Sequence, residues 1–172
     1  MHQIERLLKL LDEEGPRLHR LLFRLTLRAE VAEDLLQELF LRLRESSGFT
    51  AARSPTAFVT RTAVNLAFDW RRRQARRVET SALSDEIPAP PADLLGNLIH
   101  REQMERVLTE IAELPEAQRL ALILQHVEHQ DTEEIGRHLG RTAHQVRALC
   151  SKGLATLRVN LNNHSRPEVA DG

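Results

Sequence analysis

The sequence has few of the residues on which disulfide-bonded, zinc-binding or membrane-spanning proteins depend. Its 172 residues include one cysteine, Cys150, which excludes an intramolecular disulfide and a cysteine-built zinc site. No apolar run approaches the roughly 20 residues that cross a bilayer. The N-terminal MHQIERLLKLLDEE carries acids within its apolar pattern, unlike a signal peptide. We therefore expect a cytoplasmic protein without membrane insertion.

Glycine and aromatic residues are also scarce. The chain has seven glycines, no tyrosine and one tryptophan, whereas Leu, Ala, Arg and Glu are abundant. This composition favours helices and predicts an all-α fold. The sequence contains neither a glycine-rich phosphate loop nor a nucleophile elbow. We accordingly expect no enzyme activity and no cofactor.

The charge distribution is strongly asymmetric, although the net charge is only −1. Residues 53–77 carry seven arginines and one acid, whereas residues 78–118 carry nine acids and two arginines. A basic block followed by an acidic block indicates either different partners for the two parts or a mutual contact between them.

The basic block contains the longest predicted helix, residues 54–77. Ser54 is suited to the N-cap and Pro55 to the first helical position. The helical period places one set of residues on a buried face: Val59, Ala63, Leu66 and Trp70. The opposite face is expected to carry Arg61, Asn65, Phe68 and Arg72.

That outer face, with the arginines that follow it, has the chemistry that single-stranded nucleic acid requires. Arginines neutralise phosphates, an amide can bond to a base edge, and an aromatic ring offers a stacking plane. The alternative interpretation is a solvated amphipathic helix with a basic end.

Three shorter helical patterns precede this helix, over residues 3–13, 16–27 and roughly 30–45. Gly15-Pro16 is expected to break or redirect the chain between the first two. The third has an apolar stripe of Leu36, Leu39, Phe40 and Leu43. Its outer face carries Asp34, Gln37, Glu38 and Leu41. Residues 46–56 are expected to form a short loop in which Phe49 packs back onto the core.

A linker then divides the chain. Residues 78–91 contain three prolines and no hydrophobic period, which predicts a flexible, extended segment. Helical pattern resumes at about residue 92 and runs to Leu114, and Pro115 starts a further helix. We therefore predict two small helical domains, residues 1–77 and 92–160, with a tail over residues 161–172.

The second domain ends in the pattern of a helix-turn-helix, residues 131–158. Asp131 and Glu134 form a capping-box pattern, Gly140 ends the short helix, and Thr142 caps the next. Cys150 lies on the apolar stripe of this last helix and is expected to be a buried, inert thiol. The outward face carries His144, Gln145, Arg147, Ala148, Ser151 and Lys152. DNA binding is the favoured interpretation, and a purely structural helical hairpin is the alternative.

Four histidines in this part of the chain raise the question of a metal site. They fall across several predicted elements, without a cysteine or a matched carboxylate, so we interpret them as surface residues. They are His126, His129, His138 and His144.

Three segments, in this order, resemble bacterial RNA polymerase sigma factors of the extracytoplasmic-function (ECF) group, which are sigma-70-like. AEDLLQELF, residues 32–40, is similar to the core-binding motif of the family. AFVTRTAVNLAFDWRRR, residues 57–73, is similar to its segment for minus-ten melting and recognition. LPEAQRLALIL, residues 114–124, followed by the helix-turn-helix, is similar to its minus-35-reading domain.

The resemblance implies a sigma factor that binds core RNA polymerase and directs promoter-specific transcription initiation. Residues 1–77 would be sigma region 2 and residues 92–160 sigma region 4. The implied partners are the beta-prime clamp helices and beta flap of the polymerase, promoter DNA and, as a further candidate, an anti-sigma factor. The stretch 78–91 would thread toward the active-site channel of the polymerase.

The resemblance also implies three sets of binding residues. Those for the polymerase are Asp34, Gln37, Glu38 and Leu41. Those for minus-ten DNA are Phe49, Arg61, Asn65, Phe68, Arg71, Arg72, Arg73 and Arg76, with Phe49 and Asn65 forming a pocket for a flipped base. Those for minus-35 DNA are His144, Gln145, Arg147, Ala148, Ser151 and Lys152.

The chain departs from the family pattern at several positions. Leu27 replaces a glycine, Phe58 a tryptophan, Arg141 an apolar residue and Leu149 a common arginine.

The sequence also leaves two other functions possible. One is a stand-alone helix-turn-helix regulator that binds operators as a dimer, and the other is a helical adaptor or enzyme that uses the histidine cluster.

Overall fold

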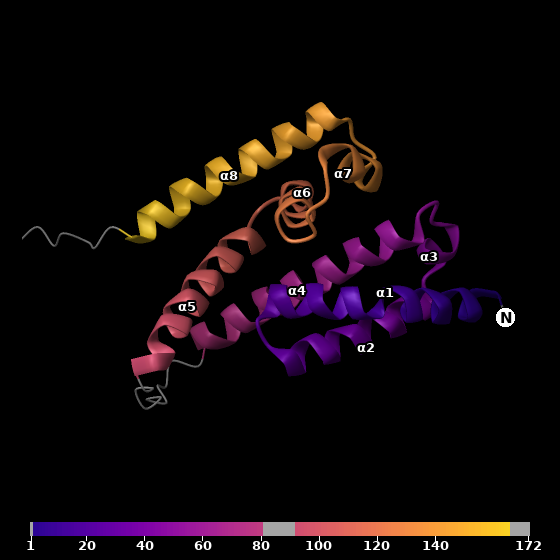
Figure 1. Ribbon diagram of the computed structural model, residues 1–172, viewed down its shortest axis with the longest axis horizontal. Coiled ribbons are helices and arrows are strands. Elements are labelled where there is room, and N and C mark those ends of the chain that lie inside the picture. Colours follow the sequence, from indigo (N-terminus) through magenta and orange to yellow (C-terminus); the bar gives the residue numbers. More distant parts are fainter. Residues whose placement is uncertain (1, 81–91, 166–172) are drawn as a thin grey trace, which may run out of the picture.

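The computed structural model describes residues 2–80 and 92–165, and every regular element in these ranges is a helix (Figure 1). The first unit consists of α1 (His2–Thr26), α2 (Ala29–Glu45), α3 (Ser47–Ala51) and α4 (Pro55–Thr80). The second unit consists of α5 (Ala92–Ala112), α6 (Glu116–His126), α7 (Thr132–Leu139) and α8 (Ala143–Ser165). The predicted all-α fold of two helical units is confirmed. Of the predicted linker, residues 81–91 lie outside the described residues.

Helix α1 runs without interruption, so the predicted break at Gly15-Pro16 is wrong. The apolar residues on both sides of Pro16 lie on one buried stripe: Leu7, Leu10, Leu18, Leu21, Leu22 and Leu25. Burial of this stripe outweighs the backbone hydrogen bond that a proline removes. Ile4 and Leu8, near the start of α1, remain 53% exposed.

The turn between α1 and α2 depends on an unusual backbone conformation at Leu27. Its φ is 59°, in the left-handed region that favours glycine. Its N–H donates to the Phe23 carbonyl at 2.7 Å, and the Thr26 hydroxyl accepts from the Arg28 N–H at 3.4 Å. The position at which the resemblance leads one to expect glycine is thus one where the backbone needs it.

Residues 46–56 are not simply the loop that the sequence predicted. They contain the short helix α3, which Ser46 caps by accepting a hydrogen bond from the Phe49 N–H at 3.1 Å. The Phe49 side chain is fully buried, which confirms that it packs onto the core. Its ring lies 6.3 Å from that of Phe58, and the Arg6 guanidinium lies over it at 5.7 Å.

The predicted long helix is confirmed as α4, which continues three residues into the predicted linker 78–91. Ser54 caps it, with its hydroxyl accepting from the Ala57 N–H at 3.3 Å. Of the predicted apolar face, Trp70 is only partly buried. The other three members are buried: Val59, Ala63 and Leu66.

In the second unit, α7 and α8 form the predicted helix-turn-helix. Asp131 accepts from the Glu134 N–H at 2.8 Å, and the Glu134 carboxylate accepts from the Asp131 N–H at 3.0 Å, so the capping box is confirmed. Gly140 ends α7 with φ of 63°. The predicted tail boundary at residue 161 is wrong, because α8 continues to Ser165. Asn160 on α8 donates to the Glu110 carboxylate of α5 at 2.9 Å.

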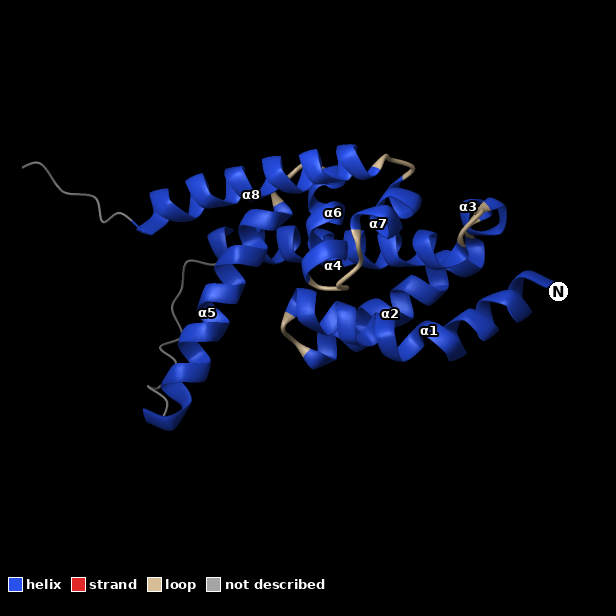
Figure 2. Ribbon diagram, turned by 45° about the horizontal axis from the view of Figure 1, so that its top comes forward, coloured by secondary structure: helices blue, strands red, loops and turns tan. Residues whose placement is uncertain are grey.

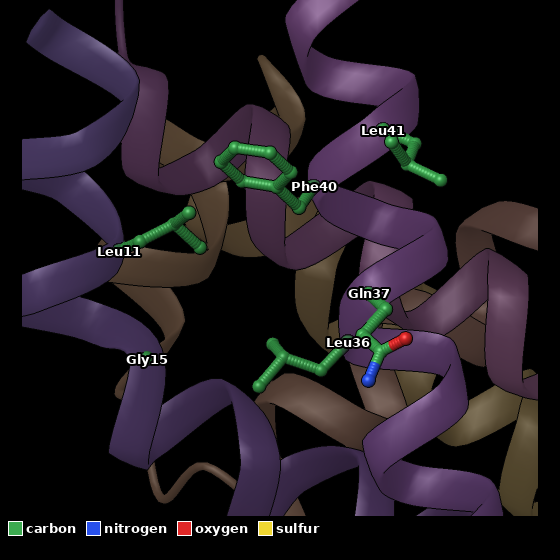
Figure 3. Close-up of a pocket in the computed structure, with 6 residues that line it drawn as sticks. All are labelled: Leu11, Gly15, Leu36, Gln37, Phe40 and Leu41. Carbon is green, nitrogen blue, oxygen red and sulfur yellow. The ribbon is translucent and has the colours of Figure 1, made fainter. Parts of the chain in front are cut away.

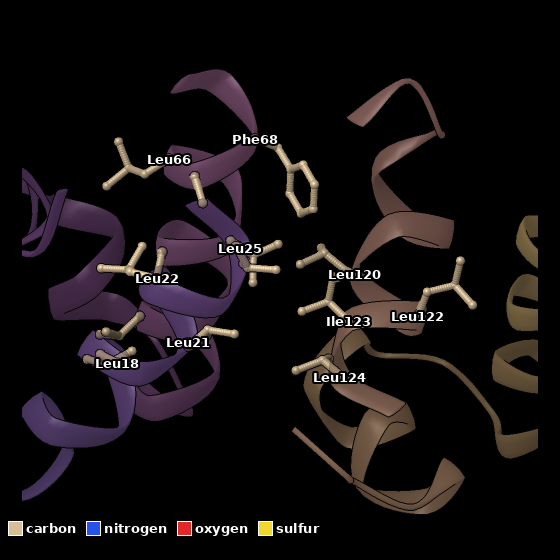
Figure 4. Packing of buried hydrophobic residues seen from close by; sticks show 14 of the residues in the cluster. Leu18, Leu21, Leu22, Leu25, Leu66, Phe68, Leu120, Leu122, Ile123 and Leu124 are labelled. Atoms are coloured by element: carbon tan, nitrogen blue, oxygen red, sulfur yellow. The ribbon is translucent and has the colours of Figure 1, made fainter. Parts of the chain in front are cut away.

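The two units share one hydrophobic core. Helix α6 lies between α4 and α8 in both overall views (Figures 1 and 2). In Figure 4, Leu120, Ile123 and Leu124 of α6 lie on the side facing the first unit, toward Leu25 of α1 and Phe68 of α4. All five side chains are at most 2% exposed, so the units pack together through apolar surface.

Gly136 gives a test of the packing in the helix-turn-helix. A Cβ at this position would lie 2.5 Å from the Arg141 carbonyl oxygen, which belongs to backbone. We expect Gly136→Ala to lower the free energy of unfolding by about 1–3 kcal/mol, as overpacking does elsewhere. Gly15→Ala is the matched control, since nothing lies within 4 Å of its Cβ position. It should raise that free energy by roughly 0.5–1 kcal/mol. Urea unfolding measures both, and a neutral Gly136→Ala would contradict the close approach.

Candidate polymerase and nucleic-acid interfaces

An open apolar groove of about 440 Å³ runs between α1 and α2 (Figure 3). Gln37 and Leu41, two of the predicted polymerase-binding residues, line it, and Leu41 is 51% exposed. Leu36 and Phe40, predicted as core, are only partly buried and line the same groove. The α1 side is formed by Leu11 and Gly15. This face therefore offers apolar surface beside polar groups.

The other two predicted polymerase-binding residues lie on the same side of α2. Asp34 is exposed, and Glu38 forms an ion pair with Arg42 one turn further along, at 2.5 Å. Glu38 therefore has an intramolecular partner, which the sequence prediction overlooked. The i, i+4 spacing that brings the two residues together is visible in the sequence.

The predicted nucleic-acid face of α4 is only partly exposed. Phe68 was expected on the outer face, and this is wrong, because its ring is fully buried between α4 and α6. Arg71 is also buried, donating to the Leu25 carbonyl and to the Glu105 carboxylate at 2.7 Å. Phe68 faces α6 and Arg71 bonds to α5. Both side chains would be exposed on an isolated α4, and the second unit covers them. The buried Phe49 ring likewise has no free face for a base.

A carboxylate from the second unit meets the two central polar residues of this face. Glu116 Oε1, at the start of α6, accepts from Arg61 Nε at 2.8 Å and from Asn65 Nδ2 at 3.1 Å. The Arg61 and Asn65 hydrogen bonds hold the pKa of the Glu116 carboxyl below its ordinary value. Glu116 is thus ionised and accepts hydrogen bonds from both side chains at once.

Arg119, which was not among the predicted site residues, lies beside this contact and bonds to Asn65. It is buried on α6, and its guanidinium lies 5.5 Å from the Phe68 ring centre. It donates to the Leu114 carbonyl at 3.1 Å and more distantly to Asn65 Oδ1 at 3.5 Å. Burial, followed by the nearby charge of Arg72, lowers its pKa. An arginine on the apolar stripe of α6 was the sequence signal for this role.

The remaining arginines of α4 differ in their exposure to solvent. Arg72 is half-buried, pairs with Asp69 at 2.5 Å and donates to the Ala112 carbonyl of α5 at 2.8 Å. Arg73 and Arg76 are exposed. Arg61 is exposed as well, although it pairs with Glu116. Arg73 and Arg76 are therefore the accessible minus-ten arginines for which the structure shows no ion pair among the residues it describes.

The outer face of the helix-turn-helix is accessible along α8. All six predicted minus-35 residues are exposed: His144, Gln145, Arg147, Ala148, Ser151 and Lys152. Gln145 is occupied locally, because its side-chain oxygen accepts from the Thr142 N–H at 3.0 Å while Thr142 caps the Gln145 N–H at 3.2 Å. The predicted Thr142 cap is thereby confirmed as one half of a reciprocal pair.

Cys150 and the histidines are the remaining side chains that could carry other chemistry. Cys150 is buried on the inner side of α8, and burial raises the pKa of its thiol, as expected for an inert cysteine. Within the described residues no group of three or more His, Cys, Asp or Glu side chains could hold a metal ion. No helix in this part of the chain is long and apolar enough to cross a membrane.

Comparisons with known proteins match two parts of the chain. The family model described as Sigma-70 region 2 matches residues 10–77, and that described as Sigma-70, region 4 matches residues 104–157. A relative from Mycolicibacterium smegmatis, "ECF RNA polymerase sigma factor SigE", is 30% identical over 160 residues. The match covers 91% of this chain and 62% of that relative, so the chain spans less than two thirds of its length.

The first match covers most of the unit that carries the groove and α4, and the second ends in the helix-turn-helix. The chain belongs to the sigma-70 family. The relative of the extracytoplasmic-function type is similar to this chain across both matched regions.

His138 provides a pH-dependent test of the contact between the units. It is half-buried on α7, and its pKa is lowered by burial and then by the charge of Arg17 on α1, with Glu134 opposing and Arg137 adding to the effect. The unfolded chain then binds a proton more readily, so stability should fall as the pH drops below about 6.5.

We expect His138→Gln to reduce the loss of unfolding free energy between about pH 7.5 and pH 5.5. The exposed His144 gives the matched control, His144→Gln. Urea titrations at both pH values measure the difference. An equal pH dependence in wild type and His138→Gln would show that this histidine is not held in its neutral form.

Proposed function

We propose that this chain is a sigma factor that binds core RNA polymerase and directs promoter-specific transcription initiation, without catalysing a reaction itself. The observation that carries the proposal is the order of two sigma-70 matches along one chain, each falling on a helical unit with a suitable surface. A stand-alone helix-turn-helix regulator has no use for the apolar groove between α1 and α2.

We assign polymerase docking to the face formed by Asp34, Gln37, Glu38 and Leu41. Support comes from the groove beside Gln37 and Leu41, because apolar surface with a polar rim is typical of protein-binding sites. The partner on core polymerase is the pair of beta-prime clamp helices. A second apolar groove, of about 270 Å³ and lined by residues such as Leu108, Leu122 and Leu154, is assigned to the beta flap.

Promoter DNA is assigned to two surfaces. For the minus-ten element, Arg73 and Arg76 supply accessible positive charge. Arg61 is exposed but paired with Glu116, and the partly buried Arg72 bonds to Ala112, so both add charge once these contacts are exchanged. Asn65 is retained for base recognition, whereas the buried Phe49, Phe68 and Arg71 are not supported as direct contacts. An anti-sigma factor stays a candidate partner that no contact here identifies.

For the minus-35 element, the exposed residues of α8 face a major groove. Arg147 and Lys152 carry the positive charge on this face, and Arg147 lies nearer the N-terminal end of the helix, which enters the groove in proteins of this design. Gln145 is better suited to holding the start of α8 than to reading a base, because its oxygen is already bonded to Thr142.

The test of the proposal is in vitro transcription with core RNA polymerase on a genomic library. Transcripts that start at a limited set of sites only when this protein is added would support it. Size measurement and polymerase pull-down separate the competitor, since a dimeric regulator would bind DNA without core and would not bind core.

Docking on polymerase predicts a specific loss of core binding. The double variant Gln37→Ala/Leu41→Ala removes one polar and one apolar group from the groove, and we expect roughly tenfold weaker core binding, the scale of an interface hot spot. Glu30→Ala, exposed near the start of α2 and away from the groove, is the control. Helix content should stay unchanged in both by circular dichroism. Wild-type core affinity in the double variant would disprove the docking site.

The minus-35 surface predicts different effects for its two cations. Arg147→Ala should reduce the free energy of DNA binding by about 1–3 kcal/mol and weaken the preference for one base. This is expected if the Arg147 guanidinium forms two hydrogen bonds with a guanine. Lys152→Ala should weaken binding about equally on all sequences and reduce the salt dependence, as expected of a phosphate contact. Competition binding with promoter libraries at several salt concentrations distinguishes the two. Equal, sequence-independent losses would make Arg147 a backbone contact.

A further inference from the structure

A pocket that the proposed function does not use lies where the α1–α2 turn, α4 and α5 meet. Its volume is about 250 Å³. The turn contributes Arg28, and α5 contributes Glu105 and Thr109. Helix α4 contributes the largest share of the lining: Trp70, Arg71, Gln74, Ala75 and Val78. Three elements that are distant in the chain thus form one pocket with both polar and apolar walls.

Arg71 supplies a buried donor to this pocket. The residue is only 6% exposed. Its Nε donates to the Leu25 carbonyl, and its Nη1 donates to Glu105 Oε2 at 2.7 Å. The third nitrogen, Nη2, is buried and has no hydrogen-bond partner within residues 2–80 and 92–165. Because a buried N–H group without an acceptor costs free energy, this nitrogen favours a ligand that brings an oxygen atom.

The charges around the pocket favour an anion. Glu105 contributes a carboxylate to the lining, and its ion pair with Arg71 offsets that charge. Arg28 is exposed, and its guanidinium lies 5.9 Å from the Trp70 ring centre. Unlike Arg71, it takes part in none of the ion pairs between described residues. Two guanidinium groups and one carboxylate leave a positive charge that an anionic ligand can neutralise.

We propose that this pocket binds a small oxyanion, carried by a carboxylate or a phosphate group. Arg71 Nη2, the Arg28 guanidinium and the amide of the half-buried Gln74 are the donors to its oxygen atoms. The ligand reaches the covered Nη2 when the Arg28 and Gln74 side chains rotate, since neither is buried. The volume is below the roughly 300–1,000 Å³ of pockets for drug-sized molecules, so a nucleotide is too large. This site does not rest on the proposed function.

The experiment uses Trp70 as a reporter, because it is the only tryptophan of the chain and it lines the pocket. Sodium phosphate and sodium acetate are titrated separately into the full chain, with sodium chloride keeping the ionic strength constant. We expect a saturable change in Trp70 fluorescence with at least one of the two oxyanions and none with chloride. The same oxyanion should raise the midpoint of thermal unfolding, since it binds the folded chain. A response to phosphate alone or to acetate alone identifies which group carries the charge.

Three variants locate the bound anion. Arg28→Ala removes an exposed donor and should weaken binding about two- to fivefold, the scale of an exposed charged contact. Ala75→Phe keeps every charge and places a ring in the pocket, so it should abolish the saturable change. Arg20→Ala is the matched control, because Arg20 is an exposed arginine of α1 that does not line the pocket, and its affinity should equal that of wild type. Circular dichroism verifies that helix content is unchanged in all three.

Several results would overturn the oxyanion site. One is the lack of a saturable response to both phosphate and acetate in wild type, and another is an equal response to chloride. Unchanged affinity in Ala75→Phe would place the anion elsewhere on the chain. Equal losses in Arg28→Ala and Arg20→Ala would reduce the effect to net charge. Isothermal titration calorimetry with the same salts repeats the comparison without the indole, so an altered Trp70 environment in a variant cannot imitate a loss of binding.

Discussion

Packing of α6 against α4 and α1 is the interaction on which the arrangement of the whole chain depends. Leu120, Ile123 and Leu124 remove apolar surface from water together with Leu25 and Phe68, and burial of this kind stabilises by roughly 25 cal/mol for each Å². The polar contacts around it are secondary, because ion pairs that keep access to water contribute little. They nevertheless decide which charged groups face the second unit, and hence which surface of α4 is covered.

The arginines of α4 differ in burial and in the groups to which they bond. Arg71 is buried and bonded to the first unit and to α5, Arg72 bridges to the end of α5, and Arg73 and Arg76 face solvent. Their positions in the helical period account for this division, since Arg71 and Arg72 lie on sides of α4 that face neighbouring helices and Arg73 and Arg76 do not. The acidic block, residues 78–118, supplies ion-pair partners for two of the arginines of α4: Glu116 pairs with Arg61, and Glu105 pairs with Arg71. Of the two possibilities that the charge pattern left open, the mutual contact is the one present in the free chain.

The distribution of exposed surfaces has a functional consequence. The groove between α1 and α2 and the outer face of α8 are accessible while the central part of the α4 face is covered. Under the proposed function, the surface assigned to the polymerase is therefore open while Asn65 is bonded to Glu116.

The sequence by itself determined the helices, most of their ends and the family. Those features arise from local signals, such as the Ser54 cap, the Asp131–Glu134 capping box and Gly140, and from periodicity within one element. It misplaced the break at Pro16 and the end of α8, because burial along α1 and the Asn160–Glu110 contact involve residues distant in the chain. Only the tertiary structure decided that Phe68 and Arg71 are buried and that Glu116 meets Arg61 and Asn65. A helical period defines which residues share a face, but whether that face meets water or another helix depends on packing between units that are separated in sequence.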